Sequence, residues 1–396
     1  MMSVLLQKPL FEGVSQKELV AQLEAKKKSQ DKLPTWFHSA NIYYPNKLNI
    51  EQTSSEATAK YKAQIVSGKS LVDLTGGFGV DSYFFSRKMD SVVHCEINPE
   101  LSEIAAHNFK VLGRENIQCI AADGMDFLKT ATQNFDWIYI DPSRRNDKKG
   151  KVFLLADCLP NLPENLDLVF QRTRHVLLKT SPLLDIKQGI SELNYVKEVH
   201  IVALNNEVKE LLFVLERDFV GDVAIQAVNI INGKEDKFRF MLDDEQNSTV
   251  VFGEPSTYLY EPNAAIMKSG GFKSIGAAYQ FHKLHPHSHL YTSPTLVDFP
   301  GRSFVIEKAL PYSKSSIKAL GVTKANITTR NFPMSVADLR KKHNIKDGGE
   351  TYLFFTKDLN DSLLVIQCTK PWTNPNWRAN RIAGPSNSSI ARRSKP

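Results

Sequence analysis

The chain has 396 residues, of which 42% are hydrophobic and 23% are charged, and it carries a formal net charge of +7. This composition is that of a globular protein with two or three domains, and no apolar run approaches the roughly 20 residues of a membrane span. The start of the chain lacks the charge order of a signal peptide, and the four cysteines form no CxxC pair. We therefore expect a cytoplasmic protein with reduced thiols and no membrane partner. The positive charge is compatible with a polyanionic partner and equally with a merely basic surface, and nothing in the composition indicates an oligomeric state.

Residues 1–65 are expected to form an N-terminal helical cap. Ser15 and Glu18 make a capping-box pattern ahead of apolar residues at helical spacing, which predicts a first helix. A second helix is predicted for residues 49–62, with Ser, Thr and Glu side chains near its start. These polar residues either cap a solvated helix or belong to a helix that covers a ligand site in the turn that follows.

Residues 66–220 alternate between short apolar runs and helical patterns, which predicts a parallel, doubly wound sheet. An Asn-Asn-Glu turn at residues 205–207 predicts a closing hairpin that adds an antiparallel strand. The expected parallel strands are 71–74, 91–96, 117–120, 135–141 and 175–179.

A glycine-rich turn follows the first of these strands. Asp73, Thr75, Gly76, Gly77 and Gly79 form the pattern Asp-x-Thr-Gly-Gly-x-Gly. Glycine lacks a Cβ atom and so allows both a sharp turn and the close approach of a ligand. No Lys-Ser/Thr pair follows, which excludes a P-loop. A nicotinamide cofactor stays open, although an acid ahead of the turn suits a cationic amino group better than a pyrophosphate.

Acidic residues stand at the carboxyl ends of four predicted strands, where open α/β sheets bind their ligands. The acid of the second strand lies about 20 residues past the glycine turn, where a carboxylate can accept both hydroxyl groups of a ribose. The acid of the third strand could contact an adenine amino group. A helix cap explains any one of these acids, but four at equivalent positions favour a ligand site. They are Asp73, Glu96, Asp123 and Asp141.

In these features, residues 66–220 resemble a class I S-adenosylmethionine-dependent methyltransferase. The resemblance implies an α/β fold with a doubly wound, Rossmann-like, seven-stranded methyltransferase sheet, and S-adenosyl-L-methionine as the cofactor. In that family the glycine turn approaches the methionine part of the cofactor, the second-strand acid holds the ribose, and the third-strand acid contacts the adenine side. The cofactor-binding residues so implied are Asp73, Thr75, Gly76, Gly77, Gly79, Glu96 and Asp123.

The fourth strand ends in Asp141, Pro142, Ser143 and Arg144, which resembles the Asp-Pro-Pro-x motif of methyltransferases that act on nucleobases. A carboxylate there can accept an N–H of an exocyclic amine and leave the nitrogen lone pair aimed at a methyl group, which is catalysis by orientation. Ser143 replaces the second proline, and Arg144 stands where an aromatic residue would stack on the base. We predict all four as catalytic residues; the alternative is an acid that caps the next helix and a solvated arginine loop.

Substrate contacts are predicted from two neighbouring stretches. Arg145 continues the fourth-strand motif, and Lys179 and Ser181 lie at the end of the fifth strand, which faces the same edge of the sheet. That strand end has no cysteine, and Cys158 lies well before it in the sequence. The covalent mechanism of pyrimidine C5 methylation is therefore disfavoured.

The last third of the chain breaks the alternation and predicts α+β structure. Residues 221–317 are expected to form a β-rich connecting domain that includes a strand at 248–252. Four histidines crowd within residues 282–289, but Pro286 interrupts them and no cysteine or nearby acid joins them. We therefore expect no metal site there.

Residues 318–372 are similar to the THUMP-like domain that is appended to methyltransferases of this kind, notably in the runs 329–333 and 338–342. The resemblance implies RNA binding, with a solvated basic face as the alternative. Residues 373–396 are expected to be a basic, disordered tail.

The sequence thus predicts a methyltransferase that modifies a nucleobase in RNA, with tRNA or rRNA as the partner. One alternative is a methyltransferase that acts on a protein or a small molecule. The other is an RNA-binding protein whose cofactor site is vestigial.

Overall fold

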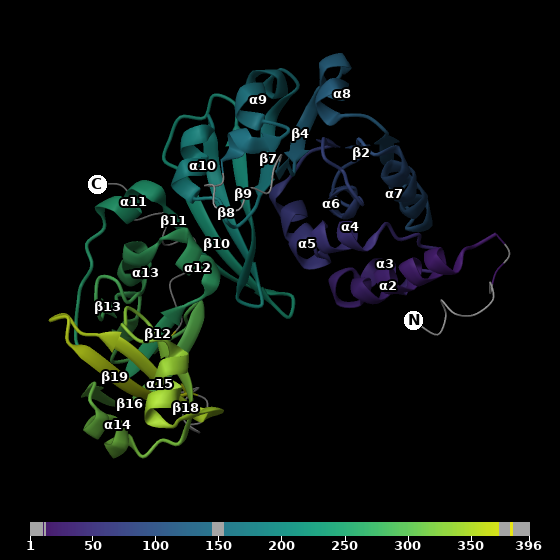
Figure 1. The fold of residues 1–396 in the computed structure, drawn as a ribbon. Coiled ribbons are helices and arrows are strands. Elements are labelled where there is room, and N and C mark those ends of the chain that lie inside the picture. Colours follow the sequence, from purple (N-terminus) through teal and green to yellow (C-terminus); the bar gives the residue numbers. More distant parts are fainter. Residues whose placement is uncertain (1–10, 12, 145–153, 372–380, 383–396) are drawn as a thin grey trace. The chain divides into compact units, whose positions relative to one another are not determined.

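The computed structural model describes residues 11, 13–144, 154–371 and 381–382. Arg145 and the expected basic tail, apart from residues 381–382, lie outside the described residues. The chain divides into two compact units (Figure 1), of which the first is Met1–Leu204 with Lys209–Gly221 and the second is Asn205–Val208 with Asp222–Pro396. None of the described helices is both long and apolar enough to cross a membrane.

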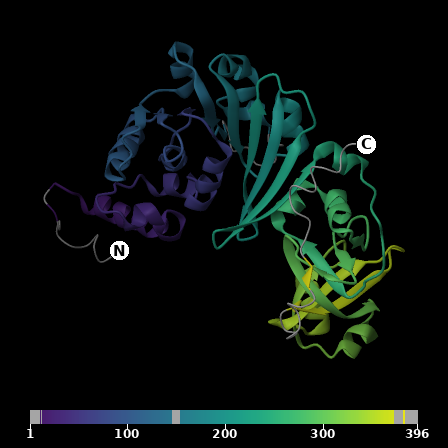
Figure 2. The ribbon, with the colours of Figure 1, turned by 180° about the vertical axis from the view of Figure 1, so that it is seen from behind.

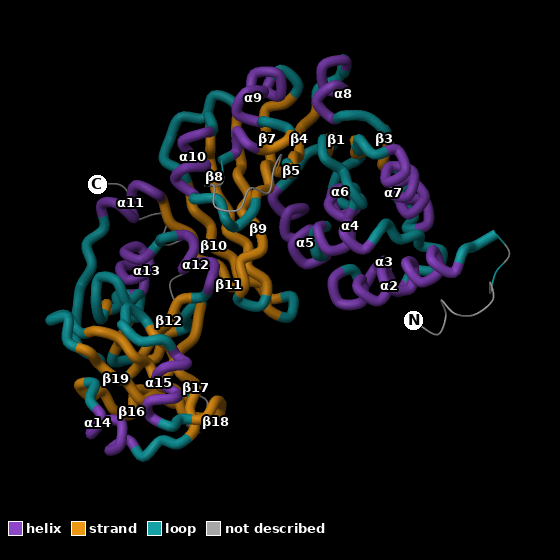
Figure 3. Tube along the Cα trace, in the orientation of Figure 1, coloured by secondary structure: helices purple, strands orange, loops and turns teal. Residues whose placement is uncertain are grey.

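The first unit begins with a segment of helices and loops, as Figure 3 shows. Its helices are α2 (Gln16–Lys32), α3 (Pro34–His38), α4 (Lys47–Gln52) and α5 (Glu56–Ile65). Ser15 caps α2 by accepting a hydrogen bond from the Glu18 backbone N–H at 3.1 Å, as the capping box predicts. The single helix predicted for residues 49–62 was wrong: Thr53 ends α4, and the Ser55 side chain caps a separate helix, α5.

A mostly parallel sheet forms the centre of the first unit. In the described part of this unit its strands are β1 (Ser70–Asp73), β2 (Ser91–Cys95), β3 (Ile117–Ile120), β4 (Phe135–Ile140), β7 (Thr173–Thr180), β8 (Val196–Leu204) and β9 (Glu207–Glu216). They follow the order β3-β2-β1-β4-β7-β9-β8, with β1 parallel to β2 and β4, and β7 antiparallel to β9. The predicted doubly wound, Rossmann-like methyltransferase sheet is confirmed, and these seven strands are part of a sheet of nine; Figure 2 shows strands of this sheet, in teal, from behind.

Helices follow most of the parallel strands. They are α6 (Val80–Phe85), α7 (Pro99–Val111), α8 (Gly124–Thr130), α9 (Leu162–Phe170) and α10 (Ile186–Glu192). Asn98, Asp123, Asn161 and Asp185 begin α7 to α10 by accepting backbone N–H groups of the first turn, which satisfies donors that a helix start leaves unpaired. A 3-10 turn (Leu155–Asp157) and a short antiparallel pair, β5 (Ser143–Arg144) and β6 (Cys158–Leu159), lie between β4 and α9 in the sequence.

The second unit contains an antiparallel hairpin of β10 (Ala224–Ile231) and β11 (Lys234–Met241) and a separate sheet. The separate sheet has the order β13-β14-β12-β16-β19-β18-β17. Its strands are β12 (Tyr258–Pro262), β13 (His282–Lys283), β14 (Tyr291–Ser293), β16 (Gly301–Pro311), β17 (Lys324–Thr329), β18 (Lys346–Lys357) and β19 (Leu363–Thr369). The short strands β15 (Leu296–Val297) and β20 (Arg381–Ile382) pair in parallel.

The helices of the second unit are α11 (Leu242–Asn247), α12 (Ala264–Ser269), α13 (Phe272–Tyr279), α14 (Lys314–Leu320) and α15 (Val336–His343). The strand predicted for residues 248–252 was wrong. Ser248 instead ends α11, and Phe252 makes an isolated bridge to Lys283.

Alternation along β18 divides the core of this sheet between its two faces. Leu353 and Phe355 pack with Ile317 of α14 and Leu339 of α15, whereas Phe354 lies in a different cluster that includes Phe304. One face is therefore covered by α14 and α15, and the other carries residues of β12, β16 and β19.

Candidate functional site

The sheet of the first unit brings the four predicted acids together. Strands β4, β1, β2 and β3 are neighbours in that order, so Asp141, Asp73, Glu96 and Asp123 end or follow consecutive strands at one edge of the sheet. That edge, at the carboxyl ends of parallel strands, is where α/β proteins bind their ligands. A site at this edge can therefore use all four strand ends at once.

The glycine turn after β1 is tightly packed at two positions and open at a third. A Cβ atom at Gly76 would lie 2.1 Å from the His94 ring, and one at Gly79 would lie 2.3 Å from the Phe109 ring. Gly77 has a φ of +56°, and a Cβ atom there would meet nothing closer than 3.9 Å. Packing within the protein thus requires Gly76 and Gly79, whereas Gly77 leaves space above the turn.

Asp73 points into the protein from the end of β1. The residue is 1% exposed; its Oδ2 accepts a hydrogen bond from the Ser82 hydroxyl at 2.6 Å, and its Oδ1 accepts one from the Thr75 backbone N–H at 3.0 Å. Burial raises the pKa of Asp73 to about 7. The two hydrogen bonds lower this pKa, but burial has the larger effect. Asp73 therefore fixes the shape of the glycine turn from the inside.

Glu96 holds the same turn from the end of β2. Its Oε2 accepts a hydrogen bond from the Gly77 backbone N–H at 2.8 Å, and its Oε1 accepts one from the Asn98 backbone N–H at 2.8 Å. The next residue, Ile97, is 68% exposed. Each carboxylate oxygen has a second lone pair, so this strand end offers acceptors for hydroxyl groups beside an exposed apolar side chain. Nothing in the sequence singled out Ile97.

Asp123 caps a helix and lies where two elements approach closely. Its Oδ1 accepts hydrogen bonds from the Met125 N–H at 2.8 Å and the Asp126 N–H at 3.1 Å. A Cβ atom at Gly124 would lie 2.2 Å from the Leu74 carbonyl oxygen, so α8 begins directly against the end of β1. The capping role that the sequence left open is present, and both capping bonds use one oxygen of the carboxylate.

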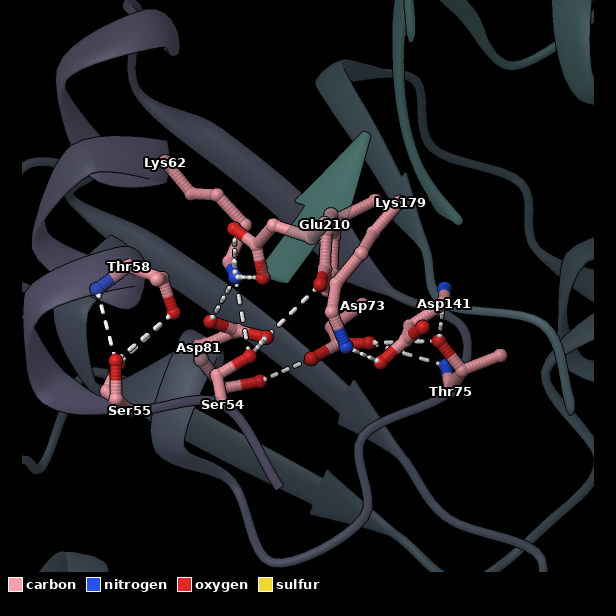
Figure 4. A network of polar contacts seen from close by, with 12 residues as sticks. Ser54, Ser55, Thr58, Lys62, Asp73, Thr75, Asp81, Asp141, Lys179 and Glu210 are labelled. Carbon is pink, nitrogen blue, oxygen red and sulfur yellow. Dashed lines mark hydrogen bonds and ion pairs between the residues drawn. The ribbon is translucent and has the colours of Figure 1, made fainter. Parts of the chain in front are cut away.

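Asp141 is joined both to the glycine turn and to β7. Its backbone N–H donates to the Thr75 hydroxyl oxygen at 2.7 Å, and its carboxylate forms an ion pair with Lys179 (Figure 4). The Asp141 side chain remains 35% exposed. Burial lowers the pKa of Lys179, but the carboxylates of Asp141, Glu210 and Asp81 outweigh burial and raise it above its usual value. Lys179 therefore stays protonated and orients the accessible carboxylate of Asp141.

The remainder of the fourth-strand motif continues into a short antiparallel pair of strands, β5 and β6. Ser143 is exposed, and the backbone of Arg144 in β5 pairs with Cys158 in β6. This pairing of β5 with β6 brings the backbone of Cys158 close to that of the fourth-strand motif. Its side chain is buried, and its Sγ donates to the Leu154 carbonyl oxygen at 3.6 Å. The thiol is packed inward, which does not favour the covalent C5 mechanism.

The predicted substrate residues on β7 have different settings. Lys179 is bound to Asp141, as described above, while the Ser181 hydroxyl oxygen accepts the Leu183 backbone N–H at 3.2 Å. Leu183 is 73% exposed. The end of β7 therefore continues into a loop with an accessible apolar side chain. In the sheet, β7 is the neighbour of β4, which Asp141 follows.

A buried network of charges connects the helical cap with the sheet (Figure 4). Lys62 on α5 is fully buried, and its Nζ donates to both carboxylate oxygens of Glu210 at 2.9 Å and to the Ser54 hydroxyl oxygen at 3.0 Å. The same Nζ forms an ion pair with Asp81 at 3.1 Å. Ser54 and Tyr139 each donate to Oδ2 of Asp81 at 2.8 Å. One ammonium group thus links α5, α6 and β9.

Nothing in the sequence pointed to Lys62 or Glu210, which are 148 residues apart and lie in no motif. Asp81 lies in the first turn of α6, where an acid interacts favourably with the helix dipole. Ser54 belongs to the polar stretch for which two roles were left open. Its hydrogen bond to Asp81, two residues after Gly79, places this stretch of the cap beside the glycine turn.

Among the residues that the structure describes, no group of three or more His, Cys, Asp or Glu side chains could hold a metal ion. In the histidine-rich stretch, His285 contacts Oδ1 of Asp361 through Nε2 at 3.2 Å. Its Nδ1 accepts the backbone N–H of His287 at 3.0 Å. Both ring nitrogens of His285 are thus used within the protein.

Comparisons with known proteins agree with these features. Two family models match the second unit: a ferredoxin-like domain over residues 258–300, and a THUMP domain-like family over residues 301–370. The crystal structure of a candidate methyltransferase from Porphyromonas gingivalis W83 superimposes with a TM-score of 0.87 and 32% sequence identity, covering 93% of this chain and 94% of that one. Uncharacterised S-adenosylmethionine-dependent methyltransferases from two strains of Mycobacterium tuberculosis are 23% identical over 301 residues, or 75% of this chain and 80% of theirs.

The prediction of an S-adenosylmethionine-dependent enzyme, made from the glycine turn and the strand-end acids, is confirmed by these relatives. The similarity to the Porphyromonas gingivalis structure extends over both units of the chain. The chain belongs to the class I S-adenosylmethionine-dependent methyltransferases that carry a C-terminal THUMP-like domain.

Proposed function

We propose that this enzyme methylates a nucleobase in RNA, with tRNA and rRNA as the candidate substrates. The position of Asp141 carries the proposal. Its backbone is bonded to Thr75 of the glycine turn, and its accessible carboxylate is oriented by Lys179. A cofactor bound at the turn and a base bound at Asp141 would therefore be neighbours.

The residues around the turn suit the cofactor, which supplies a methyl group on a positively charged sulfur when bound. The open side of Gly77 leaves room for the methionine part against the backbone of the turn. Glu96 would accept the ribose hydroxyls, and the exposed Ile97 would contact the adenine ring. Asp123, at the end of the next strand, would lie on the adenine side. Asp73, Thr75, Gly76 and Gly79 would act by fixing the shape of the turn.

Asp141 would orient the acceptor nitrogen. Its carboxylate accepts one N–H of an exocyclic amine, which leaves the nitrogen lone pair directed at the methyl carbon. The cofactor would supply its methyl carbon to that nitrogen in exchange for the sulfur–carbon bond, and the surplus proton of the nitrogen would pass to Asp141 or to water. We keep Pro142, Ser143 and Arg144 as catalytic residues beside Asp141, and Arg145, Lys179 and Ser181 as substrate contacts.

RNA as the substrate class is supported by the second unit. In its THUMP-like part, the last turn of helix α15 carries Arg340, Lys341 and Lys342. The whole chain has a net charge of +7. Clustered basic residues on one element are the usual electrostatic footprint of nucleic-acid binding.

A labelling experiment tests the proposal. The purified enzyme is incubated with S-adenosylmethionine carrying a tritiated methyl group, together with total RNA from a strain that lacks the gene. We expect label in the RNA with the wild-type enzyme and with Asp126→Asn, a control at an exposed acid on α8, and no label with Asp141→Asn. Label that enters protein or small molecules instead of RNA would contradict the proposal.

A further inference from the structure

The second unit contains two arginines held by one buried carboxylate. Glu261 on β12 is 3% exposed. Its Oε2 accepts a hydrogen bond from Arg302 Nε at 2.6 Å, and its Oε1 accepts hydrogen bonds from Arg330 at 3.1 Å from Nε and 2.8 Å from Nη2. We call Glu261, Arg302 and Arg330 the Glu261 clamp.

The sheet fixes the geometry of the Glu261 clamp. Arg302 on β16 lies directly opposite Glu261 in the β12–β16 register. Arg330 follows β17, and its backbone N–H donates to the Phe355 carbonyl oxygen at 2.9 Å. Arg302 Nη2 also donates to the Thr328 hydroxyl oxygen at 3.4 Å. Both guanidinium groups are therefore oriented before any ligand arrives; the strands involved are labelled in Figure 3.

The Glu261 clamp carries more positive charge than Glu261 can neutralise. One arginine suffices to pair a buried carboxylate, yet two are present, and their side chains remain 43% and 32% exposed. Lys370 adds a third cation, with its Nζ 4.1 Å from the centroid of the Phe304 ring. Burial, and then the charge of Arg302, lower the pKa of Lys370 to about 8, although Glu261 raises it. Cations in this arrangement repel one another, and an added anion would relieve that repulsion.

We propose that the Glu261 clamp and Lys370 bind a phosphodiester group of the RNA substrate. Arginine presents five N–H donors in a planar fork that matches phosphate, and the edge of each guanidinium not bonded to Glu261 is available for it. Phe304 and Tyr352, which lie beneath Lys370, give the patch a rigid aromatic floor. This inference rests on the proposed function, because it assumes that the polyanion is the RNA to be methylated.

Binding of full-length protein to bulk tRNA and rRNA, measured by fluorescence anisotropy over a salt series, tests the assignment. Arg302→Gln leaves Glu261 paired with Arg330, and Lys370→Gln leaves both arginines in place. We expect each variant to weaken RNA binding roughly 10-fold, as the loss of a charge-assisted contact does. Each should also flatten the slope of log affinity against log salt by about 0.7–0.9, the value for one phosphate contact.

Lys234→Gln is the matched control, because Lys234 is an exposed lysine at the start of β11, outside the THUMP-like part of the second unit. We expect it to change affinity and slope little. Circular dichroism and thermal melting of each variant separate a binding defect from misfolding. If the wild-type protein binds RNA, and Arg302→Gln and Lys370→Gln both match it in affinity and slope, the assignment of the phosphodiester site is overturned. If the wild-type protein binds no RNA at all, the proposed function itself fails, and an acidic protein becomes the partner to test.

Discussion

The two units of the protein each organise charge around a buried side chain, but the two buried side chains, Lys62 and Glu261, have opposite signs. In the first, Lys62 and Lys179 lie among three carboxylates, those of Asp81, Glu210 and Asp141. In the second, two arginines hold a single buried carboxylate. The accessible carboxylate of Asp141 can attract a cation such as a sulfonium group, whereas partly exposed arginines can attract a phosphate. The contrast suggests that each unit is charged for a different ligand.

The largest effect is expected at the accessible acid of the first unit. Asp141→Asn keeps the shape of the side chain but removes its charge, so it should lower kcat by about 10²–10⁴-fold, the usual contribution of a positioned acid–base group. Binding of S-adenosylhomocysteine, measured by calorimetry, should remain close to wild type because we assign Asp141 to the substrate and not to the cofactor. Loss of cofactor affinity equal to the loss of turnover would show that Asp141 belongs to the cofactor site.

The next largest effect is expected on stability. Lys62→Met leaves Asp81 and Glu210 buried without their ammonium partner, so it should lower the free energy of unfolding by about 3–5 kcal/mol in urea denaturation. The control is Lys60→Met on the same helix, whose 55% exposed side chain pairs with Glu56. That variant should cost less than about 1 kcal/mol. Equal losses for the two variants would contradict the central role given to Lys62.

A smaller effect is expected for cofactor affinity. Glu96→Ala removes the carboxylate assigned to the ribose and should weaken cofactor binding by roughly 1.5–3 kcal/mol, the range for hydrogen bonds to a charged group. Asp126→Ala, at the exposed acid on α8, serves as the control. Calorimetry with S-adenosylhomocysteine measures both. An affinity unchanged by Glu96→Ala would remove Glu96 from the ribose site.

A further prediction is a pH dependence of stability that originates at Asp73. Because burial raises its pKa to about 7 in the folded protein, the folded state binds a proton more tightly than the unfolded chain does. Stability from this group is therefore greatest at acid pH and falls as the pH rises from about 4 to 7. Asp73→Asn cannot ionise, so the free energy of unfolding should vary less over that range, as measured by urea titrations at several pH values. An unchanged pH profile would show that Asp73 is ionised throughout.

Local patterns were sufficient to predict the sheet and the row of acids. Apolar runs that end in Asp73, Glu96, Asp123 and Asp141 identify parallel strands and their carboxyl ends, and the family resemblance implies the Rossmann-like sheet. The break between α4 and α5 was not predicted, because Ser54 turns inward to contacts that no local pattern encodes. The Lys62–Glu210 pair joins residues that are 148 positions apart in the sequence, and such pairing depends on tertiary packing. Gly76 was predicted for ligand approach, but the structure shows that the His94 ring also requires it.

The most direct test of the central claim compares modified nucleosides in living cells. Total tRNA and rRNA are digested to nucleosides and analysed by mass spectrometry in a wild-type strain, in a strain that lacks the gene, and in that strain carrying wild-type or Asp141→Asn enzyme. We predict one methylated nucleoside that disappears on deletion, returns with the wild-type enzyme and does not return with Asp141→Asn. Identical nucleoside profiles in all four strains would contradict the claim that this enzyme methylates RNA.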